Sequence, residues 1–256
     1  MSDPVRDRWA AGEVALNAWS TLGGASAASV LAAAGFDAVT ADLQHGEQTL
    51  ERLGEVLGEI ERAGAVPFVR LGWNDPAGAM RVLDLGARGV ICPMVDTAGD
   101  AAAFVRFCRY PPLGARSYGP VRSAFGTGRE QADAANAAIL AFAQIETAAG
   151  WANVEAICAT PGLDGVYVGP ADLSLALGFE GFADLGSNDL LDALDRVVAA
   201  ASVHGVVPGI HAPSIERAIE MARRGFRFVG AAGDTELLRG GAAESIERTR
   251  ASARTS

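Results

Sequence analysis

Short runs of apolar and β-branched residues alternate along the chain with longer, alanine-rich segments whose apolar positions recur at helical spacing. Several apolar runs are almost continuous, which is typical of parallel strands covered on both faces. We therefore expect a strand and a helix to follow one another repeatedly. The expected strands are 14–19, 37–43, 65–70, 88–93, 139–145, 164–168, 206–210 and 226–230, and the expected helices are 25–34, 48–62, 76–86, 97–108, 147–159, 189–203, 213–224 and 234–252.

Eight strand–helix units in a chain of 256 residues favour one α/β domain, a (β/α)8 or TIM barrel over residues 1–256. A doubly wound open sheet is the rival architecture, and it usually shows a G-x-G-x-x-G fingerprint after its first strand. The segment after the first expected strand, LGGASAAS, lacks that spacing. Long loops rich in glycine interrupt the rhythm near 109–128 and 178–189, and such loops are usually functional or lie at subunit contacts.

The composition excludes several kinds of partner. A net charge of −10 argues against nucleic acid, whose phosphates require a positive surface. No apolar run reaches the roughly 18–20 residues that span a bilayer, and the polar start MSDPVRDRWAAGE is unlike a secretory signal. The three scattered cysteines are typical of reduced thiols, so we expect a cytoplasmic protein without a membrane partner.

The basic residues exclude whole mechanisms, because all 21 of them are arginines. Without a lysine the chain cannot form a lysine Schiff base. It also cannot carry a phosphate-binding loop that depends on lysine. Any carbonyl chemistry would then need a metal ion, an arginine or an oxyanion hole.

Polar residues stand where several of the expected strands end. In a barrel the carboxyl ends of the strands meet at one mouth, which is where barrel enzymes place their chemistry. Residues far apart in the sequence would therefore share one site. The residues at these strand ends are Trp19, Asp42, Gln44, His45, Arg70, Gln144, Glu146, Asp172 and His211.

Glu146 and Asp172 follow neighbouring expected strands, and two such carboxylates suit a hard divalent cation. Each could instead cap a helix, so metal binding and capping remain alternatives. In the segment VGPADLS, Pro170 suits the first turn of a helix. The backbone N–H groups of Ala171 and Asp172 would then be free to bind a carboxylate. A cation beside them would suit a 2-oxo acid.

Arg70 ends the apolar run AVPFVR and should point into the mouth, where it could stabilise an enolate oxygen or form a structural ion pair. His45 could act as a general base, because imidazole titrates near neutral pH, or could merely cap the next helix. Asp42, three residues before His45, could orient it or balance its charge.

Six segments together resemble the class II pyruvate-dependent aldolases of the HpcH/HpaI aldolase and citrate lyase family. The resemblance extends over nearly the whole chain, and each segment alone would be a weaker signal. The segments are FDAVTADLQHG, VRLGWNDP, ARGVICPMVDT, RYPPLGARSYGP, QIETAAGWANVEAI and DGVYVGPADLSLALG.

The resemblance implies a barrel of the phosphoenolpyruvate/pyruvate type and a carbon–carbon lyase similar to 4-hydroxy-2-oxoheptanedioate aldolase. Such an enzyme reversibly cleaves a 4-hydroxy-2-oxo acid to an aldehyde and either pyruvate or hydroxypyruvate. It implies a divalent ion, Mg²⁺, Mn²⁺ or Co²⁺, and no organic cofactor. The metal ligands carry over to Glu146 and Asp172, the base to His45 with Asp42 as its partner, and the enolate-stabilising arginine to Arg70.

The resemblance also implies substrate contacts and an assembly. Gln144 and the amides of Ala171 and Asp172 match substrate-contacting positions, and Trp19 at the end of the first expected strand is a further candidate contact. The family implies a homo-oligomer, commonly a hexamer, in which Asp84 would reach a neighbour's site.

One departure from the family pattern bears on the substrate. Many family members have Glu-His-Ala where this chain has Gln44-His45-Gly46, which leaves the aldehyde and the oxo-acid donor open.

Three other functions are rivals of the aldolase. A lyase acting on malyl- or citramalyl-CoA would need extra basic residues and a C-terminal extension, which the single last helix does not supply. A phosphate- or flavin-binding oxidoreductase could use VGAAGD as a phosphate cup, but it would leave the two carboxylates unexplained. A barrel without catalysis would not need the set of polar strand ends.

Overall fold

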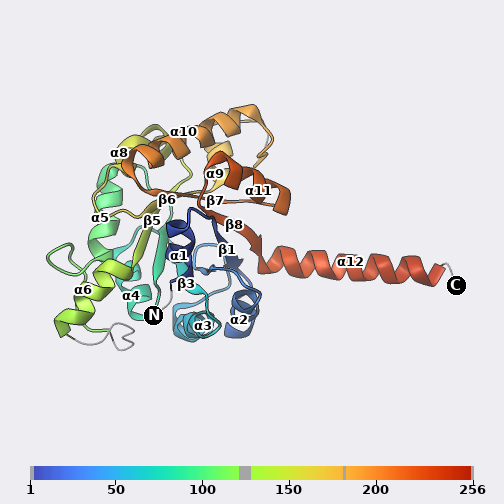
Figure 1. Ribbon diagram of the computed structural model, residues 1–256, viewed down its shortest axis with the longest axis horizontal. Coiled ribbons are helices and arrows are strands. Elements are labelled where there is room, and N and C mark those ends of the chain that lie inside the picture. The colour runs from blue at the N-terminus through green and yellow to red at the C-terminus, as the bar shows by residue number, and fades with distance from the viewer. Residues whose placement is uncertain (1–2, 121–127, 181–182, 255–256) are drawn as a thin grey trace.

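The computed structural model describes residues 3–120, 128–180 and 183–254, and its strands form a closed parallel barrel in chain order (Figure 1). Each strand pairs with the next, and the last pairs with the first. The barrel expected from the hydrophobic pattern is thus confirmed, with every strand overlapping its expected range. The strands are β1 Ala15–Ser20, β2 Ala38–Asp42, β3 Val66–Arg70, β4 Gly89–Cys92, β5 Leu140–Ile145, β6 Gly165–Val168, β7 Val207–His211 and β8 Phe228–Gly233.

Helices surround the barrel, and those in the described ranges differ from expectation in three places. Two helices were not expected, one at the N-terminus and one between the 109–128 loop and β5. The helix expected at 147–159 is two short helices that meet at Asn153. The helices are α1 Pro4–Ala10, α2 Ala25–Ala33, α3 Leu50–Arg62, α4 Pro76–Asp84, α5 Ala98–Cys108, α6 Gly128–Ala138, α7 Ala148–Ala152, α8 Val154–Cys158, α9 Pro170–Ala176, α10 Asn188–His204, α11 Ile215–Arg224 and α12 Asp234–Arg254.

The two expected long loops lie partly within the described residues. Between α5 and α6 the chain runs without a helix or strand through the described residues 109–120, while 121–127 lie outside the described residues. Between α9 and α10 the same holds for 177–180 and 183–187, with 181–182 outside. Ala183 of the second loop lines the cavity at the mouth, whereas Arg109 of the first loop bonds Asp164 just before β6.

Large aromatic rings fill the barrel interior. The ring centroids of Phe68 and Phe228 are 4.8 Å apart, and those of Phe142 and Phe228 are 5.3 Å apart. Gly89 makes room for this layer, because a Cβ added there would lie 2.2 Å from the Phe68 ring. The interior is therefore a packed core and not a channel, so chemistry can only be placed at its ends.

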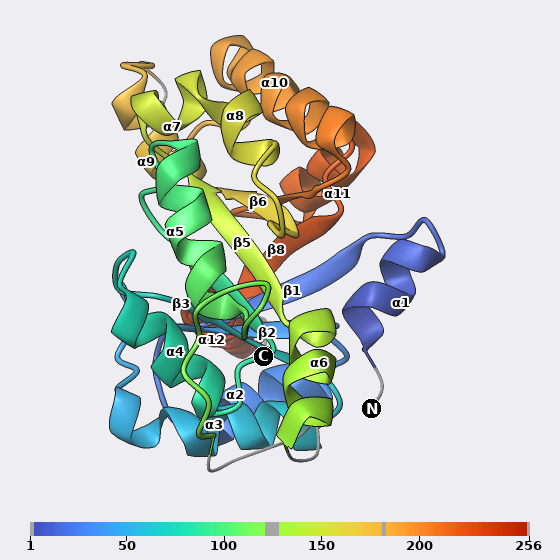
Figure 2. The same cartoon turned by 90° about the vertical axis from the view of Figure 1, so that its left-hand side faces the viewer.

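The two ends of the barrel are closed differently. Helix α1 covers the amino end, where Trp9 lies with its ring centroid 6.2 Å from those of both Phe142 and Phe228. Figure 2 shows α1 on one side of the barrel and α7 and α9 on the other. In the parts of the chain that the structure describes, no helix covers the carboxyl end in this way, and we call this end the mouth.

Helix α12 projects away from the barrel beyond the end of β8 (Figure 1). Its apolar residues Leu237, Leu238 and Ile246 are exposed in the single chain. No helix in the described parts of the chain is both long and apolar enough to cross a bilayer.

Candidate active site

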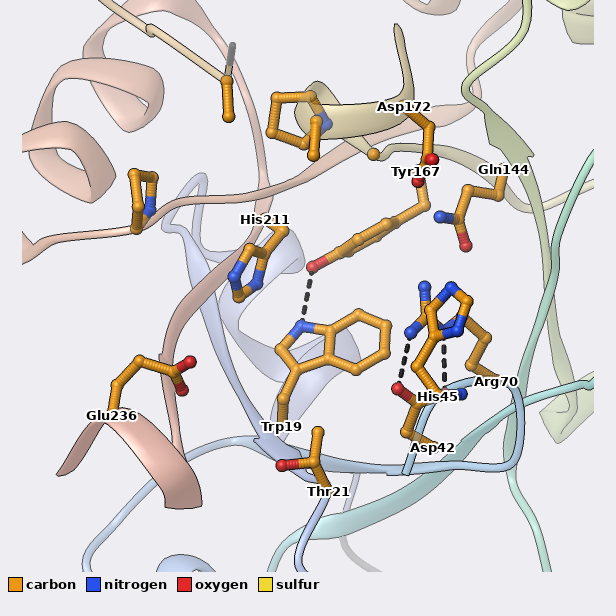
Figure 3. A pocket seen from close by; sticks show the side chains of 15 residues that line it. Trp19, Thr21, Asp42, His45, Arg70, Gln144, Tyr167, Asp172, His211 and Glu236 are labelled. Atoms are coloured by element: carbon orange, nitrogen blue, oxygen red, sulfur yellow. Dashed lines mark hydrogen bonds and ion pairs between the residues drawn. The ribbon is translucent and has the colours of Figure 1, made fainter. Parts of the chain in front are cut away.

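A cavity of about 300 Å³ opens at the carboxyl ends of the strands. It lies where the sequence predicted a shared site, and most of the candidate residues line it. Those residues are Trp19, Asp42, His45, Arg70, Gln144, Ala171 and Asp172. Figure 3 shows their side chains converging from separate strands and turns.

Asp42 and Arg70 form a bidentate ion pair at the ends of adjacent strands. Arg70 Nε donates to Asp42 Oδ1 at 2.9 Å, and Arg70 Nη2 donates to Oδ2 at 2.5 Å. The β2–β3 register sets these two residues opposite one another. The guanidinium also lies over the Trp19 ring, 4.7 Å from its centroid. These contacts fix the orientation of Arg70 beside the cavity.

The expected pairing of Asp42 with His45 takes a different form. Asp42 Oδ1 accepts hydrogen bonds from the backbone N–H groups of Gln44 at 2.9 Å and His45 at 3.3 Å. Among the described residues no hydrogen bond joins Asp42 to the His45 ring. Asp42 therefore shapes the turn that carries His45, while its charge is matched by Arg70. The His45 ring is exposed at the cavity, which Arg70 also lines (Figure 3).

Glu146 is buried directly beneath the cavity wall. Its Oε1 accepts from the Met94 backbone N–H at 2.8 Å, and its Oε2 accepts from Gln144 Nε2. A Cβ added at Gly169, which lines the cavity, would come within 2.8 Å of Glu146 Oε2. Glycine at this position therefore lets the chain pass close over the carboxylate.

The surroundings of Glu146 fit a cation. Burial raises the pKa of Glu146, and the nearby negative charge of Asp172 raises it further. Gln144 Oε1 is buried with no hydrogen-bond partner in the described structure. Two carboxylates and an amide oxygen are the hard ligands that Mg²⁺, Mn²⁺ and Ca²⁺ prefer. No group of three or more His, Cys, Asp or Glu residues with metal-binding geometry occurs in the described ranges, so other ligands would have to be water or substrate.

Helix α9 begins beside these carboxylates. Pro170 occupies its first turn, Gly169 precedes it, and no side chain caps its first amides. Asp172 is exposed in this turn, so the helix start and one of the two carboxylates face the cavity together. The short helix expected after VGPAD is confirmed.

The floor of the cavity is aromatic and includes a residue that the sequence did not indicate. Tyr167, within an apolar strand, is fully buried, and its hydroxyl accepts a hydrogen bond from Trp19 Nε1 at 3.1 Å. His211 packs edge-on to Trp19 with ring centroids 5.8 Å apart. Burial lowers the pKa of His211. Only the alternation of inward and outward positions along β6 could have indicated Tyr167.

Glu236 and Thr21 also line the cavity and were missed from the sequence. Glu236 lies in the first turn of α12, immediately after β8, where an acidic residue is expected for the helix dipole alone. Asp234, in the same turn, accepts hydrogen bonds from Thr21 and Leu22 backbone N–H groups and so ties β1 to α12. The signal that could have found Glu236 was its place directly after the eighth strand.

Asp84 lies away from this cavity. Its Oδ1 accepts from Arg116 Nη2 at 2.7 Å, and Arg116 is itself buried over the Tyr110 ring at 4.5 Å. The pair anchors the 109–120 loop to α4.

Comparisons with known proteins agree on one family. The family model described as HpcH/HpaI aldolase/citrate lyase matches residues 16–240. The hydroxypyruvate/pyruvate aldolase of Rhizorhabdus wittichii is 37% identical over 96% of this chain and 98% of its own length. The 4-hydroxy-2-oxovalerate aldolase of Rhodococcus jostii is 40% identical over 90% and 89%. A solved HpcH/HpaI aldolase/citrate lyase family protein from Burkholderia cenocepacia superimposes with a TM-score of 0.89 at 33% identity, covering 97% of this chain and all of that one.

Proposed function

Because the chain belongs to the HpcH/HpaI aldolase/citrate lyase family and is an aldolase-type lyase, we propose that it reversibly cleaves 4-hydroxy-2-oxo acids with the help of a divalent cation. The products would be an aldehyde and either pyruvate or hydroxypyruvate. The names of its relatives support both the reaction and the oxo-acid product.

The cation would be held by Glu146 and Asp172, with Mg²⁺, Mn²⁺ or Co²⁺ as the candidates. A divalent ion at this place would withdraw electron density from the ketone and carboxylate oxygens of a 2-oxo acid. The substrate carboxylate would also meet the free backbone N–H groups of Ala171 and Asp172 at the start of α9. Gln144, whose Oε1 lacks a partner, would contact the substrate or a water at the same end of the cavity.

Arg70 would stabilise the enolate oxygen that forms as the carbon–carbon bond breaks. The ion pair with Asp42 and the stacking on Trp19 hold its guanidinium in place before substrate binds. A donor that is fixed in advance costs no reorganisation when charge develops, and such a donor contributes about 10²–10³ in rate.

His45 would take the proton from the 4-hydroxyl in the cleavage direction, directly or through a water. The C3–C4 bond then breaks, its electrons form the enolate, and the aldehyde leaves. Protonation of C3 completes the oxo acid, and the reverse order gives aldol addition. The exposure of His45 at the cavity gives it access to both substrate and water.

The observation that carries the proposal is the convergence of Asp172 and Arg70 on one cavity at the barrel mouth, with Glu146 buried directly behind Gly169 in its wall. The test is to incubate the protein with 4-hydroxy-2-oxo acids, with and without EDTA, and to follow release of the oxo acid. Activity that survives chelation would overturn the metal. In parallel, His45→Ala should lower kcat by about 10²–10⁴ if His45 is the base.

We further propose that the enzyme acts in the cytoplasm as a homo-oligomer, with a hexamer as the state implied by the family resemblance. The exposed apolar residues of the projecting helix α12, Leu237, Leu238 and Ile246, support an additional contact surface in the assembly. Light scattering after size-exclusion chromatography measures the state directly. A monomer would overturn this part of the proposal alone.

A further inference from the structure

The cavity has two chemically different ends. The end with Gln144, Asp172 and Arg70 is where the 2-oxo acid would lie, whereas His211 and Glu236 stand across the Trp19 ring from it (Figure 3). If the oxo acid occupies the first end, the carbons that come from the aldehyde must extend toward the second. His211 and Glu236 therefore border the part of the substrate that the family resemblance left open.

His211 offers one hydrogen-bonding atom to this space. Its Nδ1 is buried without a partner and faces inward, 3.2 Å from where a Cβ at Gly230 would lie. Its Nε2 has no partner among the described residues and is not buried, so it is the ring nitrogen that a ligand can reach. The edge-on contact with Trp19 holds the ring at the cavity wall. A fixed polar atom in an otherwise aromatic and proline-lined wall favours a polar ligand group.

Glu236 adds a negative charge at the rim of the same end. Its carboxylate lies close to Gly233, where an added Cβ would come within 2.2 Å of Glu236 Oε2, so it folds back toward the barrel. No hydrogen bond or ion pair to Glu236 occurs in the described parts of the chain. It is close enough to His211 to affect that residue's pKa.

Within the described ranges, no arginine lines this rim. Arg70 is the one arginine among the described residues that line the cavity. Its Nε and Nη2 both donate hydrogen bonds to Asp42. Burial keeps His211 neutral near pH 7 by lowering its pKa. An aldehyde that carries a carboxylate, phosphate or sulfonate would therefore bring a second negative charge toward Glu236 without compensation.

A hydroxyl group matches this end better than either an anion or an alkyl chain. It can donate to the Glu236 carboxylate and exchange a hydrogen bond with His211 Nε2, because a hydroxyl is both donor and acceptor. An alkyl chain would displace water from these groups without replacing its hydrogen bonds. The polar groups left unpaired would weaken binding of such a chain.

We propose that His211 and Glu236 form the aldehyde end of the site and select an uncharged, hydroxylated aldehyde. This inference rests on the proposed aldolase function and assigns the substrate class that function leaves open. Both residues are specificity-determining, since neither is needed at the carbon–carbon bond that breaks.

The test compares three aldehydes of similar reach as acceptors for pyruvate: glyceraldehyde, butanal and succinic semialdehyde. Ratios of kcat/KM are measured for the metal-loaded enzyme. The wild type should prefer glyceraldehyde over both others. His211→Phe should lower the glyceraldehyde-to-butanal ratio by about three- to tenfold, the size of one lost hydrogen bond. His211→Gln should keep the ratio, because its amide can replace the imidazole Nε2.

A second variant isolates the charge. Glu236→Gln should raise the succinic semialdehyde-to-glyceraldehyde ratio by about three- to tenfold, whereas Glu244→Gln, which removes an exposed carboxylate farther along α12, should leave the ratio unchanged. His204→Phe, at the end of α10, is the matched control for His211→Phe.

The outcomes separate the two proposals. If none of the aldehydes reacts, the aldolase function itself is wrong. If they react but the ratios do not change in His211→Phe and Glu236→Gln, the aldehyde end is assigned wrongly while the aldolase stands. Preference for a cationic aminoaldehyde over glyceraldehyde, lost in Glu236→Gln, would overturn the hydroxyl in favour of an ammonium group.

Discussion

The guanidinium of Arg70 and the carboxylate of Asp42 are joined by two parallel hydrogen bonds, Nε to Oδ1 at 2.9 Å and Nη2 to Oδ2 at 2.5 Å. The pair spans adjacent strands, and Asp42 is 1% exposed in its side chain while Arg70 is 12% exposed. A geometry with two donors on one plane belongs to arginine and cannot be reproduced by lysine. The pair thus fixes the orientation of the Arg70 guanidinium and not only the position of its charge.

Arg70→Lys is therefore expected to lose activity although it keeps the charge. We expect kcat for cleavage of a 4-hydroxy-2-oxo acid to fall at least tenfold in Arg70→Lys and about 10²–10³-fold in Arg70→Ala. KM should change less than kcat, since the oxygen that Arg70 stabilises becomes fully charged only as the enolate forms. Steady-state kinetics on purified variants give both quantities.

Arg52→Lys, an exposed arginine on α3, controls for the chemistry of the substitution and should match the wild type. If Arg70→Ala stays within about tenfold of wild type, Arg70 serves the fold and the enolate is stabilised elsewhere.

Glu146 gives a prediction about metal removal that does not depend on turnover. Without a cation, its buried carboxylate lies near Asp172 with only partial compensation from the Met94 amide and Gln144. A cation that binds only the folded state at 100 times its Kd should add about 2.7 kcal/mol to the free energy of unfolding. Mn²⁺ or Mg²⁺ should therefore raise the Tm of the wild type, and EDTA should reverse the rise.

The same melt in Glu146→Gln should show little or no increase with metal, while Glu130→Gln on the exposed face of α6 should behave like the wild type. An equal increase in all three proteins would mean that the ion binds elsewhere.

The barrel could be predicted because its signal is repeated and local. Continuous apolar runs such as AVPFVR and the spacing of the helices between them identify each unit, and closure of eight parallel strands follows. Helix α1 was not predicted, and there is a physical reason. Asp3 caps α1 through its side chain, and its tertiary packing at the barrel end, through Trp9, is not encoded in any periodic pattern.

The candidate site was predictable only as far as strand ends determine it. Arg70 ends β3, Glu146 follows β5, and Asp172 lies in the first turn of the helix after β6, so the topology brings them to the same end of the barrel. The partner of a side chain is decided by register and rotamer, which a sequence does not state. Asp42 was expected to orient His45 or balance its charge. It contacts His45 through the backbone N–H, whereas the ion pair with Arg70 follows from the β2–β3 register, which the sequence does not state.

Gly89 yields a stability prediction from the packing of the barrel interior. A methyl group there would lie 2.2–2.3 Å from three atoms of the Phe68 ring, which is fully buried and stacked 4.8 Å from Phe228. Because both rings are fully buried and in contact, Gly89→Ala should lower the free energy of unfolding by about 1–3 kcal/mol. Chemical denaturation followed by fluorescence or circular dichroism measures the change.

Gly240 provides the matched control, because it lies inside α12 with nothing within 4 Å of an added Cβ. Alanine there should be neutral or stabilise by up to about 1 kcal/mol, since it favours the helix. A Gly89→Ala protein as stable as Gly240→Ala would show that the aromatic layer can rearrange.

His211 makes stability depend on pH in a defined direction. Burial lowers its pKa in the folded protein, and Arg70 lowers it further, while the negative charges of Glu236 and Asp42 act the other way. In the unfolded chain the imidazole titrates near its ordinary value of about 6.5. Below that pH the unfolded state binds the proton more readily than the folded state, so stability falls as the pH drops from about 6.5 toward the folded pKa and is retained above it.

His211→Gln should remove this contribution, and the difference between the two proteins isolates it from every other titrating group. The free energy of unfolding is measured by urea denaturation at several values between pH 7.5 and 5.5. The wild type should lose stability more steeply on acidification than His211→Gln, by up to about 1.4 kcal/mol per pH unit, the limit for one proton. His204→Gln, the same change near the surface, accounts for the substitution itself. Parallel curves for the wild type and His211→Gln would mean that His211 is as easily protonated in the folded protein as in the unfolded chain, and a steeper curve for His211→Gln would reverse the assigned direction.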